Sequence, residues 1–455
     1  VEADYLEECD DSWWGNNTAS HDVQLNDTYP TESGWPISVE GVVSTTPLLV
    51  DLDEDTDLEI VVLTGTSLTA FEPDGTHIWE IETEDFISGQ HPLAADLDQD
   101  GEIEILLASG NGIKVINNIG RVLYTLSGSG TLFVVGDMDE QESGLELCVA
   151  DNDILDLYSW SSSLSRLIHI TDKDLDYPES RYGISLACSD LTGDSSEDVV
   201  YCNYAIDAER QGGLPRTLVV YDWESDTVPY TMSWHEESYS AYLAVGELSG
   251  TKMIGYSFGS YKLQPGDFPA MLVEPDGSTQ EYLCDRGTAN AGRLRCGVFA
   301  DWDPLVEGAD AFVLPSEVEC LAWNQYGAML ADWPTFAYSG SEINSSISPT
   351  ALGDLDDNGL ADVLFSTKLS GVHSLLAYGS DGYPLDNLDF PIGLPDNVLA
   401  PGGFSIADID RDGNIEIVFG TTDGLLHCWE FGTCSTGYAP WVQFQHDHGR
   451  TGVLE

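Results

Sequence analysis

Residues 96–107 read DLDQDGEIEILL, and residues 408–419 repeat the pattern as DIDRDGNIEIVF. Carboxylates stand at every second position of a short loop, a glycine allows a tight turn, and an apolar run follows. Oxygen ligands at positions one, three, five and nine, with a backbone carbonyl at position seven, are how a loop surrounds Ca²⁺. Position twelve is Leu107 or Phe419 rather than the glutamate of an EF-hand, and EIEILL is typical of a buried strand. The pattern therefore predicts a calcium loop inside a β-hairpin.

The loop recurs along the chain and defines a repeat. Each copy has an apolar run before the loop, another after it, a third that ends in a turn such as EPDG (72–75), and a fourth. Four antiparallel strands in a unit of this length are typical of a β-propeller blade. We therefore expect an all-β, eight-bladed β-propeller over residues 34–455, preceded by a tail over 1–33. The eight loops start 41 to 57 residues apart, at Asp51, Asp96, Asp137, Asp190, Glu247, Asp301, Asp354 and Asp408.

Strand order and ring closure follow from the same pattern. The inner strands are apolar on both faces, because neighbouring blades cover both. The last unit ends irregularly as GYAPWVQF, so we expect GWPISVE (34–40) to supply the fourth strand of blade eight. The calcium loops share one face with the EPDG-type turns. The other face receives the longest loops, 203–215 and 257–269, and ten of the fifteen cations, Lys173 among them, fall on that face or near its rim. We expect it to be a contact surface.

These loops, on repeats of this length, resemble FG-GAP/VCBS repeats, which occur in integrin alpha-subunit propellers and in many secreted bacterial proteins. The ending FQHDHGRTG also resembles the tail that closes some bacterial members. In such families the loops bind Ca²⁺. The resemblance implies five calcium sites, in units one, two, four, seven and eight, and none in unit five, where ELSGTK lacks the carboxylates. The implied ligands, with a backbone carbonyl at the fourth residue of each set, are Asp51, Asp53, Asp55, Asp57 and Glu59; Asp96, Asp98, Asp100, Glu102 and Glu104; Asp190, Thr192, Asp194, Ser196 and Asp198; Asp354, Asp356, Asn358, Leu360 and Asp362; and Asp408, Asp410, Asp412, Asn414 and Glu416.

Units three and six share a longer variant of the loop. Its spacing is Asp-x-Asp-x4-Gly-x-Glu/Asp, and the shared spacing favours a retained site with one extra residue, whereas a decayed loop is the alternative. The candidate ligands of these two possible sites are Asp137, Asp139 and Glu146, and Asp301, Asp303 and Asp310.

The composition limits the classes of partner. The chain has 80 acidic and 15 basic residues, a formal charge of −65, which argues against nucleic acid and anionic membranes and suits salty or divalent-rich surroundings. No apolar run approaches the roughly 18 residues of a membrane span. Nothing at Val1 resembles a signal peptide, so if the protein is exported the numbering starts after cleavage. We expect an extracellular or cell-surface protein.

Nine cysteines form no Cys-x-x-Cys metal site. Cys188 and Cys202 lie symmetrically about a predicted hairpin tip and are candidates for a cross-strand disulfide. The stretches 284–296 and 428–434 each begin and end with cysteine and would each close a small loop. Buried thiols are the alternative, and disulfides would indicate an oxidising compartment.

Catalytic signatures are weak. The regular tryptophans do not sit in the docking pattern of quinoprotein dehydrogenases. Calcium-bearing propeller lyases act on polysaccharides with a base and a cation, whereas His91, His169, His373 and His427 share no motif, and HDH (446–448) is better explained by packing at the chain end. The tail 1–33 has nine acidic residues, no Lys or Arg, and the apolar pair Trp13 and Trp14.

We therefore expect a non-catalytic propeller for assembly or adhesion. A filament or sheath subunit that self-associates through the tail is the leading version. An adhesin for a protein or glycan is the second, and a polysaccharide-active enzyme such as a lyase is the third.

Overall fold

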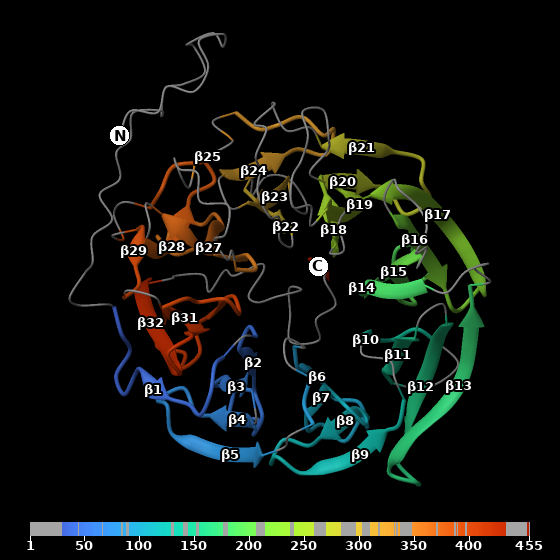
Figure 1. The fold of residues 1–455 in the computed structure, drawn as a ribbon, viewed down its shortest axis with the longest axis horizontal. Helices are drawn as coiled ribbons and strands as arrows, with labels where there is room; N and C mark the ends of the chain where they lie inside the picture. Colours follow the sequence, from blue (N-terminus) through green and yellow to red (C-terminus); the bar gives the residue numbers. More distant parts are fainter. Residues whose placement is uncertain are drawn as a thin grey trace.

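The chain forms a ring of eight β-sheets around a central axis in the computed structural model (Figure 1). The structure describes residues 30–433 apart from gaps, and the strand residues Val453–Leu454. The longer gaps are 140–143, 176–180, 206–213, 237–240, 259–269, 284–296, 303–309 and 337–347. In each antiparallel sheet the first strand lies nearest the axis and the fourth lies at the rim (Figure 1). The predicted all-β, eight-bladed fold is confirmed.

Each blade contributes four strands in meander order. Blade one has β2 (Leu48–Val50), β3 (Glu59–Leu63), β4 (Ser67–Phe71) and β5 (His77–Glu82). Blade two has β6 (Leu93–Ala95), β7 (Glu104–Ser109), β8 (Gly112–Ile116) and β9 (Val122–Leu126). Blade three has β10 (Leu132–Gly136), β11 (Glu146–Asp151), β12 (Ile154–Ser161) and β13 (Arg166–Asp174). Blade four has β14 (Arg181–Ser189), β15 (Asp198–Ala205), β16 (Leu214–Asp222) and β17 (Thr227–Glu236).

The second half of the ring follows the same plan. Blade five has β18 (Ala241–Leu248), β19 (Thr251–Phe258), β20 (Ala270–Val273) and β21 (Gln280–Leu283). Blade six has β22 (Val298–Ala300), β23 (Ala311–Pro315), β24 (Glu319–Trp323) and β25 (Thr335–Phe336). Blade seven has β26 (Ala351–Gly353), β27 (Asp362–Leu369), β28 (Val372–Tyr378) and β29 (Ile392–Gly393). Blade eight has β30 (Ser405–Ala407), β31 (Asn414–Gly420), β32 (Leu425–Thr433) and β1 (Ile37–Ser38).

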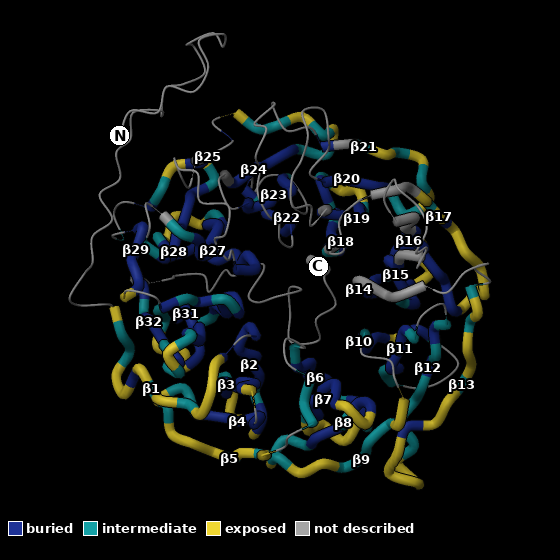
Figure 2. The backbone as a smooth tube through the Cα atoms, in the orientation of Figure 1, coloured by how far each residue is buried: buried dark blue, intermediate teal, exposed yellow. Residues whose placement is uncertain are grey.

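The core lies between the blades. Every residue of β3 and β7 is buried, whereas the outer strand β5 alternates between exposed and half-buried positions (Figure 2). One cluster joins Val61 and Leu63 of blade one to Ile105 and Leu107 of blade two, all at most 2% exposed. The apolar inner strands are therefore covered on both faces, as the sequence predicts.

An aromatic contact at the rim couples each of several blades to the next. The indole Nε1 of Trp79 on β5 donates to the Asn118 carbonyl in the turn of blade two, at 2.7 Å. The Trp79 ring lies on Gly120, where an added Cβ would come within 2.7 Å of it. Tyr230 covers Gly277 of blade five in the same way. The turn glycines are required by their positive φ, 77° and 71°, and by the neighbouring ring.

Ring closure agrees with the prediction for residues 34–40. Strand β1 pairs antiparallel with β32, with Ile37 opposite Leu426, and completes blade eight. Pairing begins within the predicted tail, because Thr31 bridges to Trp429. Residues 1–29, including Trp13 and Trp14, lie outside the described residues.

The other end of the chain reaches the centre of the ring (Figure 1). Strand β33 (Val453–Leu454) pairs in parallel with the innermost strand of blade five, β18, with Val245 opposite Val453. The segment after FQHDHGRTG therefore adds a fifth strand to blade five. His446 and His448 lie outside the described residues.

The predicted Cys188–Cys202 disulfide is wrong. The β14–β15 register places Cys188 opposite Val199 and Cys202 opposite Ser185. Because Ser185 and Cys188 are an odd number of positions apart, the two thiols point to opposite faces of the sheet. Cys188 Sγ donates to the Val135 carbonyl at 3.5 Å, and Cys202 Sγ donates to the Tyr256 hydroxyl at 3.7 Å.

The other proposed disulfides lie partly beyond the described residues. Cys428 is a buried free thiol, so the structure does not pair it with Cys434. Cys284, Cys296 and Cys434 lie outside the described residues. Among the residues that the structure describes, no helix has the length and hydrophobicity needed to cross a membrane.

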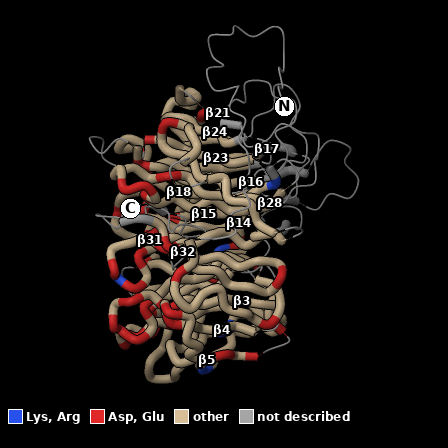
Figure 3. The backbone as a smooth tube through the Cα atoms, turned by 90° about the vertical axis from the view of Figure 1, so that its left-hand side faces the viewer, with Lys and Arg blue, Asp and Glu red and all other residues tan. Residues whose placement is uncertain are grey.

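Acidic loops gather along one face of the ring. Seen edge-on, Asp and Glu are concentrated along one side of the disc (Figure 3). The hairpin loops between first and second strands lie on the same face as the turns between third and fourth strands, because successive strands are antiparallel. Lys173, near the end of the outermost strand β13, lies 2.7 Å from Asp226 in the β16–β17 turn of blade four. The outer strand runs along the rim toward the next blade, which explains this contact.

Candidate metal centres

The hairpin loop of blade two folds around its own carboxylates. The Gly101 N–H donates to Asp96 Oδ2 at 3.2 Å. The Asp100 N–H donates to Asp98 Oδ1 at 3.2 Å, and the Glu102 N–H donates to Asp100 Oδ1 at 2.9 Å. Gly101 has a φ of 95°, which favours glycine at this position. The alternating aspartates therefore satisfy backbone donors that the tight turn leaves without strand partners.

The last acidic residue of each loop accepts a hydrogen bond from the backbone at the start of that loop. Glu104, the first residue of β7, is 2% exposed, and its Oε2 accepts the Leu97 N–H at 3.1 Å. We call it and its equivalents the capping carboxylates. The other six bonds run to Glu59 from Leu52 (2.6 Å), Glu146 from Met138 (2.9 Å), Asp198 from Leu191 (2.8 Å), Asp310 from Trp302 (2.9 Å), Asp362 from Leu355 (2.8 Å) and Glu416 from Ile409 (2.9 Å).

Four loops bring three carboxylates together. In each, the residues at positions one, three and nine offer oxygens that all lie within 4.8 Å of one another. The position-five aspartates Asp55, Asp100 and Asp412 are not in these groups, and each accepts the N–H of position seven. The backbone carbonyls of position seven stay predicted ligands. The four groups are Asp51, Asp53 and Glu59; Asp96, Asp98 and Glu104; Asp354, Asp356 and Asp362; and Asp408, Asp410 and Glu416.

The donor set of these four groups fits a hard divalent cation. Each group contains at least one buried carboxylate oxygen that has no hydrogen-bond partner among the described residues. An unsatisfied buried oxygen costs free energy, and an ion that accepts its lone pair removes that cost. All the donors are oxygens, as Ca²⁺ prefers. The oxygens are Oδ1 of Asp51, Asp96, Asp356, Asp362 and Asp408, and Oε1 of Glu59.

Burial raises the pKa of the capping carboxylates. Desolvation, followed by the nearby aspartates, raises the pKa of Glu104 to about 8. The pKa of Asp362 and of Glu416 rises to about 8 and that of Glu59 to about 7, with burial again the largest cause in each. Three carboxylates crowded at a buried position therefore need a cation to be ionised together.

Blades three and six keep the capping bond without a described three-carboxylate group. In blade three, burial raises the pKa of Glu146 to about 7, and Glu146 Oε1 has no hydrogen-bond partner among the residues that the structure describes. Asp137 and Asp139 do not form a group with it among the described residues. In blade six Asp301 and Asp310 are described, and Asp303 lies outside the described residues. Both sites stay predictions.

Blade four differs because a lysine reaches its loop. Blade five replaces the acidic loop with a two-residue turn, Ser249 (φ 50°) and Gly250 (φ 80°). Just beyond it, the Lys252 ammonium donates to the Asp190 carbonyl and lies 3.6 Å from Asp190 Oδ2. In the search of the described residues, Asp190, Asp194 and Asp198 do not appear as a three-carboxylate group. In blade four the Lys252 ammonium therefore lies beside Asp190, the first predicted calcium ligand. The calcium site of blade four stays a prediction.

A fifth metal-ligand group lies away from the loops, on the rim of blade three. It consists of Asp156, His169 and Asp172. The sequence offers no spacing signal for it, because the three residues meet only through the pairing of two strands.

Comparison with solved structures agrees with the propeller fold. The exotype rhamnogalacturonan lyase YesX matches with a TM-score of 0.57 and 15% identity, over 92% of this chain and 80% of its own. A Bacillus licheniformis rhamnogalacturonan lyase matches with a TM-score of 0.55 and 16% identity, over 93% and 78%. Saccharomyces cerevisiae Sqt1 matches with a TM-score of 0.54 and 8% identity, over 89% and 100%. At these identities the likeness shows the fold alone. No family model matches the chain, and no curated protein matches it.

The raised pKa values predict how stability depends on pH in metal-free protein. The folded state holds protons on the capping carboxylates up to about pH 7–8, whereas the unfolded chain releases them near 4.5. The folded state therefore binds more protons, and the stability should fall as pH rises from about 5 to about 8. Glu104→Gln should make this decline shallower, because it removes one titrating group, and the exposed Glu102→Gln should not. Thermal melts of resin-stripped protein measure both, and a melting temperature that rises over this interval would contradict the assignment.

Proposed function

We propose that this protein is a calcium-stabilised, non-catalytic propeller of the extracellular space or the cell surface, used for assembly or adhesion. The observation that supports it most directly is the set of four carboxylate groups with buried, unsatisfied oxygens. A structural metal would let these carboxylates ionise at neutral pH. Free calcium is abundant outside cells, where loops of modest affinity are filled.

Calcium fits the loops better than a softer metal. Their side-chain donors are carboxylate and amide oxygens, and zinc-class ions select imidazole or thiolate. Calcium also accepts six to eight ligands: positions five and seven would bring the ligand residues to five, and a bidentate carboxylate or water would supply the rest. The proposed ion lies at the junction of the first and second strands and would tie the hairpin at the point where like charges repel. It has a structural role in this proposal.

The tail is the proposed element of self-association. Its acidic residues are repelled by the ring, so docking needs compensation on the acceptor surface. Two cations of the expected contact surface are already engaged: Lys114 lies 2.6 Å from Asp85, and Lys173 lies 2.7 Å from Asp226. The tryptophans of the tail should therefore contribute most of the affinity. Docking on a neighbouring subunit would build a head-to-tail filament or sheath, and an adhesin for a protein or glycan is the second version.

A polysaccharide lyase is the competing function, because two structural neighbours carry that activity at 15% and 16% identity. A pocket where blades seven and eight meet holds about 180 Å³ and includes Asp423 and His427. This volume is below the range of about 300–1,000 Å³ that small-molecule sites occupy.

We expect no unsaturated sugar ends when the protein is incubated with acidic polysaccharides, measured by ultraviolet absorbance. Clear turnover would replace the non-catalytic proposal.

Calcium should raise the melting temperature of stripped protein by several degrees. Each site contributes about 2.7 kcal/mol when free calcium is a hundredfold above its dissociation constant, because the unfolded chain binds it poorly. Asp98→Asn should remove part of this gain, since it deletes one carboxylate of the blade-two group. Asp74→Asn is the matched control, because Asp74 is exposed in a turn on the same face and belongs to no group. An unchanged melt on calcium addition excludes the metal.

The tail hypothesis predicts loss of association without loss of the fold. The truncation should end at residue 29, because the Pro30 carbonyl and the Glu32 N–H make backbone hydrogen bonds with β32. Deleting 1–29, or changing Trp13 and Trp14 to Ala, should give a calcium-responsive monomer, whereas the full chain associates. Light scattering across protein concentrations measures the mass, with the melting temperature as the control for folding. Equal association of full and truncated chains, or a full chain that stays monomeric at high concentration, would refute tail docking.

A further inference from the structure

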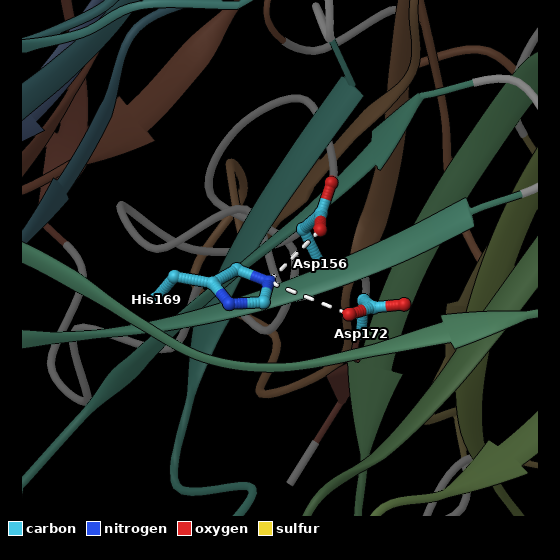
Figure 4. Close-up of side chains that lie close together, drawn as sticks. All are labelled: Asp156, His169 and Asp172. Atoms are coloured by element: carbon cyan, nitrogen blue, oxygen red, sulfur yellow. Dashed lines mark hydrogen bonds and ion pairs between the residues drawn. The ribbon is translucent and has the colours of Figure 1, made fainter.

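The rim of blade three carries a metal-ligand group of different chemistry from the loops. His169 and Asp172 lie on the outermost strand, β13, and Asp156 lies on the adjacent strand, β12 (Figure 4). The imidazole Nε2 of His169 is 3.1 Å from Asp156 Oδ1 and 4.0 Å from Asp172 Oδ1. One atom from each residue lies within 4.8 Å of the other two. The three side chains therefore converge on one point of the surface (Figure 4).

A β-bulge creates this convergence. Residues three apart on a regular strand point to opposite faces. Here Leu157 pairs with Thr171 and Tyr158 pairs with His169, so β13 contains one extra residue between them. The extra residue returns His169 and Asp172 to the face that carries Asp156, which pairs with Asp172. Bulges commonly re-aim side chains in this way.

A neighbouring aromatic ring packs against the His169 imidazole, and the nearest lysine in sequence is paired elsewhere, so that it does not neutralise the two aspartates. The His169 ring packs edge-on against Tyr158, with 5.2 Å between centroids. Lys173 is next to Asp172 in sequence, but its ammonium lies 2.7 Å from Asp226 and 5.1 Å from the centroid of the Tyr221 ring. The lysine that could have neutralised the aspartates is thus engaged by blade four.

We propose that Asp156, His169 and Asp172 bind a divalent cation of the zinc class at the rim of blade three. One imidazole nitrogen and two carboxylate oxygens suit Zn²⁺, whereas calcium sites use oxygen donors alone. In a tetrahedral zinc site with bonds of about 2.0–2.2 Å, two ligand atoms lie roughly 3.3 Å apart. The His169–Asp156 distance of 3.1 Å matches this edge, the His169–Asp172 distance of 4.0 Å exceeds it by less than 1 Å, and all three ligand atoms lie within 4.8 Å of one another. Three protein ligands leave the fourth position to water or to a group from a partner.

The bound ion would link β12 to β13 on the exposed side of the blade. The three side chains are 26%, 42% and 57% exposed in the order Asp156, His169 and Asp172, so an ion can reach them from solvent. An ordinary surface ion pair between a histidine and an aspartate contributes about 0–1 kcal/mol and uses only one carboxylate. The proposal therefore depends on the convergence of the second carboxylate, Asp172.

The test is a zinc titration of the full chain in excess calcium, which keeps the oxygen-only loops filled. Competition with a chromophoric zinc chelator should show one site that His169→Ala and Asp172→Asn each weaken by tenfold or more. His77→Ala is the matched control, because His77 is also exposed on an outer strand, β5, and belongs to no group of three. Cobalt should give visible absorption bands that the His169 variant lacks.

The outcomes distinguish a specific zinc site from an ordinary surface ion pair. Retained calcium-dependent melting in every variant shows that the fold is intact, so a loss of zinc affinity is then local. Zinc affinity that is the same in wild type, His169→Ala and Asp172→Asn would overturn the proposal. So would an equal loss of affinity in His77→Ala, which would indicate nonspecific binding to surface histidines.

Discussion

A hydrogen bond from the backbone at the start of each acidic loop to a buried carboxylate at its end is the interaction on which the ring depends. It recurs in seven blades, at 2.6–3.1 Å, always between the second loop residue and the capping carboxylate. It fixes the angle at which the innermost strand turns into the second strand. Because these strands are covered on both faces by neighbouring blades, a change in that angle would disturb two cores at once.

The same bond introduces an electrostatic problem. A carboxylate that is almost fully buried beside two aspartates is costly to ionise, and it is surrounded by a protein of net charge −65. The blades resolve the problem differently. Four loops present the oxygen groups that we propose for calcium, whereas the loop of blade four has Lys252 beside Asp190. Blade five has no acidic loop, and its short turn is what places Lys252 near its neighbour.

Coupling between blades explains why a glycine recurs in several of the turns between third and fourth strands. Trp79 and Tyr230 each cover the turn glycine of the following blade. That glycine therefore permits the turn and also leaves room for the aromatic side chain. The two ends of the chain contribute at separate places. Strand β1 completes blade eight, and β33 lines the inner edge of blade five, where it reaches the axis of the ring.

The sequence by itself determined the features that depend on local pattern. The eight loops, the four-stranded unit, the two-sided burial of inner strands and the closing strand at 34–40 follow from spacing and alternation, and the structure agrees with each. The tertiary structure alone decided what depends on register and on contacts between blades. It placed Cys202 opposite Ser185, three positions from Cys188, so that the two thiols lie on opposite faces of the sheet. It also brought Lys252 to Asp190, and it joined Asp156 to His169 and Asp172 through a bulge. One extra residue in a strand reverses which side chains share a face, and no local pattern records where it falls.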